Sequence, residues 1–113
     1  MSLTEKRCTA CEGGVSPMDS NEARQYLAEV PGWTLTHDDT RIARRFKTQD
    51  FASALAFTQT IGALAEEEDH HPQITLGWGF VEVELYTHKI GGLHQNDFIL
   101  AAKVNQAWNA AGG

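Results

Sequence analysis

The segment from residue 81 to residue 88 alternates between two kinds of side chain, and it constrains the fold more than any other part of the chain. Successive residues of a β-strand point to opposite faces, so a two-residue period indicates a strand with one apolar face. One face would carry Val81, Val83, Leu85 and Thr87, and the other Glu82, Glu84, Tyr86 and His88. This segment is the clearest strand of the sequence, and it predicts a sheet covered on one side.

Three further strands are expected at residues 33–37, 41–46 and 74–78, and the turn signals between them favour antiparallel hairpins. Asp19 with Glu22 resembles a capping box that opens a short helix, which Pro31-Gly32 ends. A last helix is expected over residues 95–110. The element order α-β-β-α-β-β-α predicts an α+β fold, in which helices pack on one face of a four-stranded antiparallel sheet.

The longest expected helix spans residues 50–69. Its apolar stripe is wide, so the helix should lie against the sheet; the stripe comprises Phe51, Ala54, Leu55, Thr58, Ile61, Leu64 and Ala65. The helix ends in four acidic residues, 66–69, and Pro72 breaks it. Negative charge is unfavourable at a helix C-terminus, so we expect Glu67 and Glu68 to be solvated.

The 113 residues suffice for one domain, which we place at residues 19–113 after a flexible N-terminal arm, residues 1–18. The net charge of −6 argues against nucleic acid as a partner. The basic residues Arg41, Arg44, Arg45 and Lys47 are expected to form a solvated strand face. Neither a membrane-spanning run nor an apolar leader is visible, so no membrane partner is expected and a cytoplasmic location is the default.

Two patterns could carry chemistry. Cys8 and Cys11 form a C-x-x-C pair without a second pair, which favours chance or a weakly bound metal over redox catalysis. His70 and His71 follow a helix, and His88 ends the next hairpin, so the three should meet at one sheet edge.

Imidazoles titrate near neutrality and suit general acid–base catalysis. Glu66, four residues before His70, would share its helical face if the helix continues that far, and Asp97 lies in the first turn of the last helix. Surface histidines remain an alternative, as does a metal site built from the three histidines with Glu66 or Asp97.

A longer pattern resembles a known family. The pattern consists of Glu66, His70-His71-Pro72, Trp78, Thr87-His88, Gly92-Leu93 and Asp97. This set resembles the signature of the pterin-4a-carbinolamine dehydratase family, bacterial type. The similarity extends over residues 20–110 and includes Pro31-Gly32-Trp33, the segment from Phe46 to Phe51 and the run from Leu93 to Phe98.

The resemblance implies a hydro-lyase that converts 4a-hydroxytetrahydropterin to quinonoid dihydropterin and water. This reaction recycles the cofactor of aromatic amino acid hydroxylases, needs no metal or organic cofactor, and occurs in homodimers or tetramers. It implies catalytic roles for His70, His71 and His88, with supporting roles for Glu66 and Asp97. His71 and Trp78 would contact the pterin.

Two alternatives stay open: a non-catalytic, dimeric binding or regulatory protein on the same scaffold, and a role on molybdopterin-related pterins. One position departs from the family pattern. His94 stands where many members carry Thr or Ser, and histidine is a poorer helix N-cap. Either His94 has another task or the last helix begins at Asn96, and we assign His94 no catalytic role.

Overall fold

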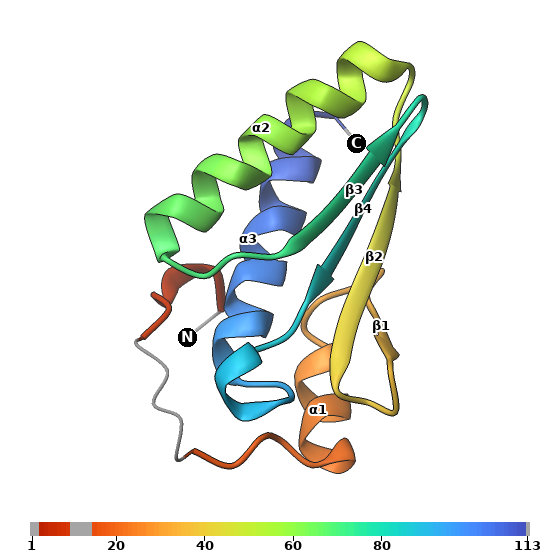
Figure 1. Ribbon diagram of the computed structural model, residues 1–113. Coiled ribbons are helices and arrows are strands. Elements are labelled where there is room, and N and C mark those ends of the chain that lie inside the picture. Colours follow the sequence, from red (N-terminus) through yellow and green to blue (C-terminus); the bar gives the residue numbers. More distant parts are fainter. Residues whose placement is uncertain (1–2, 10–14, 113) are drawn as a thin grey trace.

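The computed structural model describes residues 3–9 and 15–112 of the chain. Four strands form one antiparallel sheet in the order β1-β2-β4-β3: β1 (Thr34–Thr36), β2 (Arg41–Lys47), β3 (Gln73–Gly77) and β4 (Phe80–Leu85). The helices are α1 (Ser20–Leu27), α2 (Phe51–Glu68) and α3 (Gln95–Ala110), with 3-10 turns η1 (Leu3–Glu5) and η2 (His88–Ile90). Both α2 and α3 lie on the same side of the sheet (Figure 1). The predicted α+β class and element order are confirmed.

The alternation in β4 sets the buried face of the sheet. Val81, Val83 and Leu85 are fully buried, whereas Glu82 between them is exposed. The neighbouring strand β2 presents Ile42 opposite Leu85, and their common face packs under the helices. Each such side chain contributes about 1.5–3 kcal/mol when it is fully buried. The sheet is therefore held to α2 and α3 by the face that the sequence predicted.

Helix α2 is rotated relative to the predicted stripe. Phe51 and Leu55, expected to be buried, are 49% and 43% exposed, and Phe57 instead enters the core. Its ring lies 5.0 Å from that of Phe46 and 4.9 Å from that of Trp108. The prediction for Phe51 and Leu55 was wrong because apolar residues occupy more than one side of this helix. Periodicity alone could not select the side that faces the sheet.

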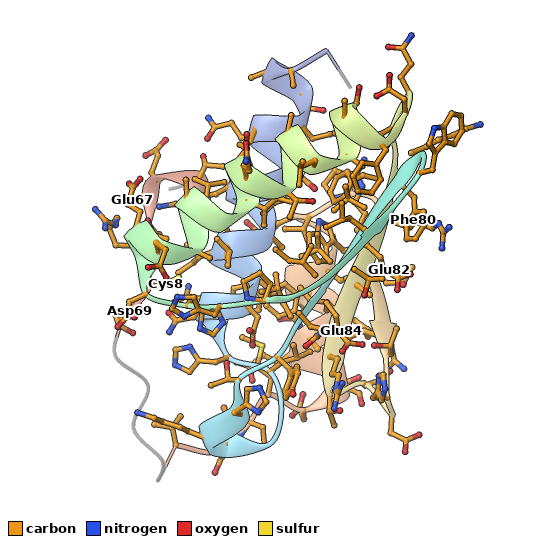
Figure 2. The ribbon with its side chains drawn as sticks, turned by 45° about the horizontal axis from the view of Figure 1, so that its top comes forward. Cys8, Glu67, Asp69, Phe80, Glu82 and Glu84 are labelled. Atoms are coloured by element: carbon orange, nitrogen blue, oxygen red, sulfur yellow. The ribbon has the colours of Figure 1, made fainter. Side chains whose placement is uncertain are left out.

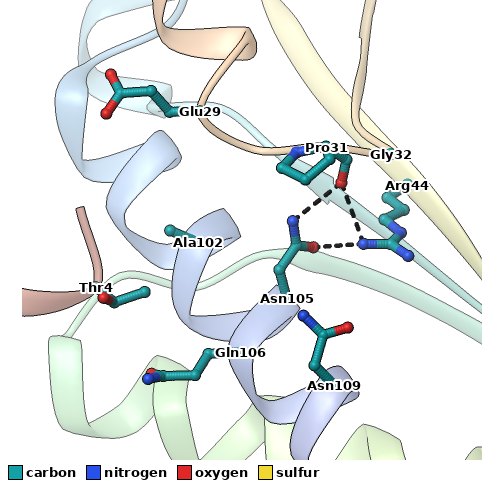
Figure 3. Close-up of a pocket in the computed structure, with 9 residues that line it drawn as sticks. All are labelled: Thr4, Glu29, Pro31, Gly32, Arg44, Ala102, Asn105, Gln106 and Asn109. Atoms are coloured by element: carbon teal, nitrogen blue, oxygen red, sulfur yellow. Dashed lines mark hydrogen bonds between the residues drawn. The ribbon is translucent and has the colours of Figure 1, made fainter. Parts of the chain in front are cut away.

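Arg44 lies on the helix-facing side of β2, among apolar neighbours, and its guanidinium is held there by neutral groups. It donates to Asn105 Oδ1 at 2.7 Å and to the Pro31 carbonyl at 3.2 Å. Asn105 Oδ1 also accepts from Trp33 Nε1 at 2.8 Å. Pro31, Arg44 and Asn105 border an open cavity of about 510 Å³ (Figure 3). Burial lowers the pKa of Arg44 below its ordinary value.

The predicted N-terminal arm has a docked part. Leu3 is 4% exposed against the core, and η1 contacts α3. Burial, followed by the nearby Glu68 carboxylate, raises the pKa of the Cys8 thiol to about 12, so this thiol stays protonated at neutral pH. Cys11 lies outside the described residues. The mobility of the arm stays a prediction, as does the domain boundary at residue 19.

No helix in the described ranges is long and apolar enough to cross a membrane. The cytoplasmic location stays a prediction.

Candidate active site

The chain reverses direction immediately after α2. Asp69 adopts left-handed backbone angles (φ 51°, ψ 42°), a conformation that aspartate tolerates better than most residues. The reversal separates the two histidines that follow. Glu66 therefore pairs with His71 and not with His70, so the expectation that Glu66 and His70 share a helical face was wrong. That expectation required the helix to continue to residue 70, but it ends at Glu68.

His70 is held by a buried carboxylate. Its Nε2 lies 2.6 Å from Asp97 Oδ1, and Asp97 is fully buried. The other oxygen, Oδ2, accepts from the Thr87 hydroxyl at 2.9 Å and from the His94 amide at 3.0 Å. Since an ionised carboxylate only accepts hydrogen bonds, Nε2 must carry the proton. Nδ1 of His70 is then the nitrogen that can exchange a proton with a ligand.

His71 has an exposed carboxylate partner. Its Nε2 lies 2.5 Å from Glu66 Oε2, and the two side chains are 56% and 78% exposed. Ion pairs at such a surface contribute about 0–1 kcal/mol because water and salt screen them. This pair can orient the His71 ring without fixing it rigidly.

His88 begins η2, three residues after Leu85, the last residue of β4. Its ring lies 4.2 Å from that of Tyr86, tilted by 50°. The Arg41 guanidinium lies 4.0 Å from the Tyr86 ring centroid and bonds Glu84 at 2.7 Å. Thus Tyr86 supports His88 from one side. Arg41 is half-buried and paired, so the expected solvated basic face does not include it.

His94 is the N-cap of α3. Its Nδ1 accepts from the Asn96 amide at 3.0 Å, and Asp97 accepts from the His94 amide to complete a capping box. The helix begins at Gln95, so the alternative start at Asn96 was wrong. An imidazole nitrogen can replace the usual hydroxyl oxygen as the acceptor. His94 therefore has a structural task, and it also helps to hold Asp97.

The three predicted histidines line one cavity of about 290 Å³. Its other lining residues come from the N-terminal segment, the α2 end, the segment that follows β4, and α3; the full set is Thr9, Asp69, His70, His71, Tyr86, Thr87, His88, Lys89 and Asn96. Sequence reasoning missed Tyr86, Thr9 and Asn96 as lining residues. For Tyr86 a signal existed, since it shares the polar face of the strand with His88. We call this cavity the histidine pocket.

Trp78 does not belong to the histidine pocket. It lies in the β3–β4 turn, is 74% exposed, and is separated from His88 by the whole of β4. In Figure 2, Phe80 at the start of β4 lies on the other side of the view from Asp69 at the end of α2. Within one chain, Trp78 and the histidines are not brought together. Trp78 is not among the lining residues of the histidine pocket, and its predicted pterin contact stays a prediction.

The metal alternative required the histidines to converge with a carboxylate. Within residues 3–9 and 15–112, no group of three or more His, Cys, Asp or Glu side chains is arranged to hold a metal ion. Each carboxylate instead contacts the Nε2 atom of a different histidine: Asp97 that of His70, and Glu66 that of His71. This arrangement suits proton transfer better than metal ligation.

Glu68 contradicts its predicted solvation. It is 5% exposed, lies 2.7 Å from Lys103 Nζ and 3.0 Å from Arg7 Nε, and accepts from the Cys8 amide at 2.8 Å. Burial alone would raise its pKa, but the hydrogen bonds from Lys103 and Cys8, with the charge of Lys103, lower that pKa to about 2. The neighbouring Glu67 is exposed, as predicted. At the acidic end of α2, Glu67 is thus solvated, whereas Glu68 is buried and ion-paired.

Together these features define a class: a small α+β domain whose pocket combines histidines with carboxylates that orient them. The sequence profile described as pterin 4 alpha carbinolamine dehydratase matches residues 16–107. The chain belongs to the pterin-4a-carbinolamine dehydratase family. It is 56% identical to a protein of Halorhodospira halophila and 50% identical to one of Methylococcus capsulatus, each over 105 residues. Those alignments cover 93% of this chain and 96% and 92% of the relatives, whose names mark the dehydratase activity as inferred.

Two solved structures are similar. One is described as a transcriptional coactivator/pterin dehydratase from Brucella melitensis; it has a TM-score of 0.75 and 31% identity, over 80% of this chain and 97% of that one. The other is described as a pterin dehydratase-like protein identified as a RuBisCO assembly factor; it has a TM-score of 0.57 and 26% identity, over 66% of this chain and 87% of that one. The scaffold therefore occurs in proteins with different described roles.

Proposed function

We propose that this protein converts 4a-hydroxytetrahydropterin to quinonoid dihydropterin and water. One observation carries the proposal: His70, His71 and His88, from two separate segments, line a single pocket. In the reaction the bond from C4a to the hydroxyl oxygen breaks, and the oxygen leaves as water after it gains a proton. The adjacent ring nitrogen loses a proton, and its electrons form the carbon–nitrogen double bond. No electrons leave the molecule, so the reaction needs no oxidant.

Each histidine has a role that follows from its support. His70, fixed by Asp97, and His88, supported by Tyr86, are the acid and base. His71, whose partner Glu66 is exposed, contacts and orients the pterin. Positioned imidazoles accelerate such transfers by about 10²–10⁴-fold. Glu66 and Asp97 position imidazoles and transfer no proton to the substrate themselves.

The decay of the ultraviolet signature of the 4a-carbinolamine tests the proposal. The protein should accelerate it, and His70→Ala or His88→Ala should remove most of the effect. His37→Asn is the matched control, because His37 lies outside the pocket with a positive φ (52°) that asparagine tolerates. A folded wild-type protein that gives no acceleration would contradict the proposal.

Recycling of the cofactor of aromatic amino acid hydroxylases is the proposed context. A hydroxylase gene beside this one would support it, whereas molybdenum cofactor genes would favour the molybdopterin-related pterins. The coactivator description of the Brucella melitensis protein keeps a regulatory role as the second candidate. The acidic net charge of −6 and the intact histidine set favour catalysis.

Self-association into a dimer or tetramer is proposed as well. Three large apolar side chains, Phe51, Leu55 and Trp78, are each at least 43% exposed, which supports an interface that covers them. Light scattering at micromolar concentration measures the mass, and a strict monomer would contradict this expectation.

A further inference from the structure

The histidine pocket has one wall that comes from the N-terminal segment. Thr9 lines the pocket with the histidines, although it precedes His70 by about sixty residues. Figure 2 shows Cys8 beside Asp69 at the end of α2. The family profile begins at residue 16, so this segment lies outside the part of the chain that defines the family. The family signature alone therefore does not account for the whole pocket.

Asn96 holds the main chain of Thr9 from both sides. The Thr9 amide donates to Asn96 Oδ1 at 2.9 Å, and Asn96 Nδ2 donates to the Thr9 carbonyl at 2.6 Å. Asn96 itself is 2% exposed and follows the N-cap of α3 by two residues. Its position is therefore fixed by the same cap that holds Asp97. The reciprocal bonds fix the backbone of Thr9 relative to the carboxylate that orients His70.

Glu68 supplies the second anchor. It accepts from the Cys8 amide and pairs with Lys103, while Arg7 donates to the Glu67 carbonyl at 3.2 Å. The loss of one partner from such a buried ion pair is costly, because the other charge is left buried and unpaired. The pair therefore holds the Glu68 carboxylate in place. It ties residues 7–8 to the last turn of α2, two residues before His70.

We infer that Thr9 is a functional wall of the histidine pocket: it contacts the bound pterin, Asn96 positions it, and the anchored residues 7–8 hold the segment that carries it. The inference rests on the proposed function. Asn96 occupies both main-chain groups of Thr9, and Thr9 is exposed and lines the pocket, so its side chain is the part left to contact a ligand. Proton transfer belongs to the imidazoles, so Thr9 affects how tightly the pterin binds and leaves the chemical step unchanged.

A bulky side chain at residue 9 tests the wall. Thr9→Trp should raise KM about tenfold or more while kcat stays within about twofold, because the indole occupies ligand space without touching the proton-transfer step. Thr34→Trp is the matched control: Thr34 is also an exposed threonine, and it lies on β1 away from the pocket. Both sites are exposed, so neither variant should unfold. Equal KM values for Thr9→Trp and wild type would overturn the inference.

A double variant tests the positioning role of Asn96. Asn96→Ala removes both bonds to Thr9 and lets the segment move away, so Thr9→Trp should then obstruct the pocket less. The double variant should show a KM at least about threefold lower than the product of the two single effects predicts. A KM equal to that product would overturn the role of Asn96. Circular dichroism establishes that each variant is folded.

Binding of 7,8-dihydropterin, followed by fluorescence, separates this inference from the proposed function. If the wild type binds the probe but does not accelerate carbinolamine decay, the dehydratase proposal fails. The dissociation constant of Thr9→Trp for the probe then still tests whether Thr9 contacts the pterin. If the wild type is active and Thr9→Trp matches it in both assays, only the wall fails. If the wild type neither binds nor catalyses, both fail.

Discussion

His70 and His71 are adjacent in the sequence, yet each pairs with a carboxylate in a different environment. The buried half of the site joins His70 to Asp97, which is fully buried and held by two further hydrogen bonds. The exposed half joins His71 to Glu66, which is 78% exposed. A histidine paired with a carboxylate is therefore rigid in the buried half and adjustable in the exposed half. We expect the rigid one to transfer protons and the adjustable one to orient the ligand.

The first prediction compares the two histidines directly. His70→Gln should lower kcat about 10³-fold, because it removes a fixed proton-transfer group. His71→Gln should lower kcat about tenfold at most and act mainly on KM, because it removes an orienting contact. Steady-state kinetics with the carbinolamine measures both. If the two variants lose kcat equally, the division into a rigid and an adjustable half is wrong.

The second prediction concerns the stability of the two carboxylates. Asp97→Ala leaves three donors without their acceptor in a buried site: the Thr87 hydroxyl, the His94 amide and His70 Nε2. It should lower the free energy of unfolding by about 2–4 kcal/mol, as expected for buried polar groups that lose their partners.

Glu66→Ala is the comparison for Asp97→Ala, and it should change the free energy of unfolding by less than about 1 kcal/mol. Urea unfolding measures both variants. Equal losses would show that burial does not distinguish the two pairs.

Acid provides the third test, through two neighbouring glutamates. The pKa of Glu68 is lowered from 4.5 to about 2 in the folded protein. Its contribution to stability is therefore complete above pH 4.5 and is lost as the pH falls from 4.5 towards 2. Glu68→Gln should lower stability at pH 7 by on the order of 2–3 kcal/mol, and its stability should depend less on pH within this window.

Glu67→Gln is the matched control for this titration, since it removes the same charge from an exposed neighbour. Its urea midpoint should follow that of the wild type from pH 7 to pH 3. A Glu68→Gln variant with the same acid sensitivity as the wild type would contradict the assigned pKa.

The sequence predicted the sheet better than the site's internal pairing. Alternation over residues 81–87 is a local property, and it placed Val83 and Thr87 on the buried face correctly. The partner of Glu66 depended on where α2 ends, which one left-handed residue, Asp69, decides. The burial of Glu68 depended on Lys103, thirty-five residues away, so no local pattern could indicate it.

The members of the pocket divide in the same way. The family signature indicated His70, His88 and Asp97 together, although no spacing rule connects them. Thr9 was not predicted to line the pocket because it lies in an unpatterned segment. Asn96 was not predicted because its sequence context is that of an ordinary helix residue. Only the three-dimensional arrangement shows that Asn96 holds Thr9. Sequence reasoning therefore identified the groups for chemistry and missed those that shape the cavity.

The smallest expected effect belongs to the exposed half and tests why it is adjustable. Glu66→Gln should raise KM about two- to threefold at low salt, because the His71 ring loses a weak, solvent-exposed partner. In 1 M salt the Debye length falls to about 3 Å, which weakens that pair in the wild type, so the two proteins should converge. Asp97→Asn should change the kinetic constants to the same extent at both salt concentrations. The hydrogen-bond partners of Asp97 are buried, so salt screens them much less. If the Glu66→Gln defect persists in 1 M salt, Glu66 contacts the pterin directly, and the exposed half is a second fixed part of the site.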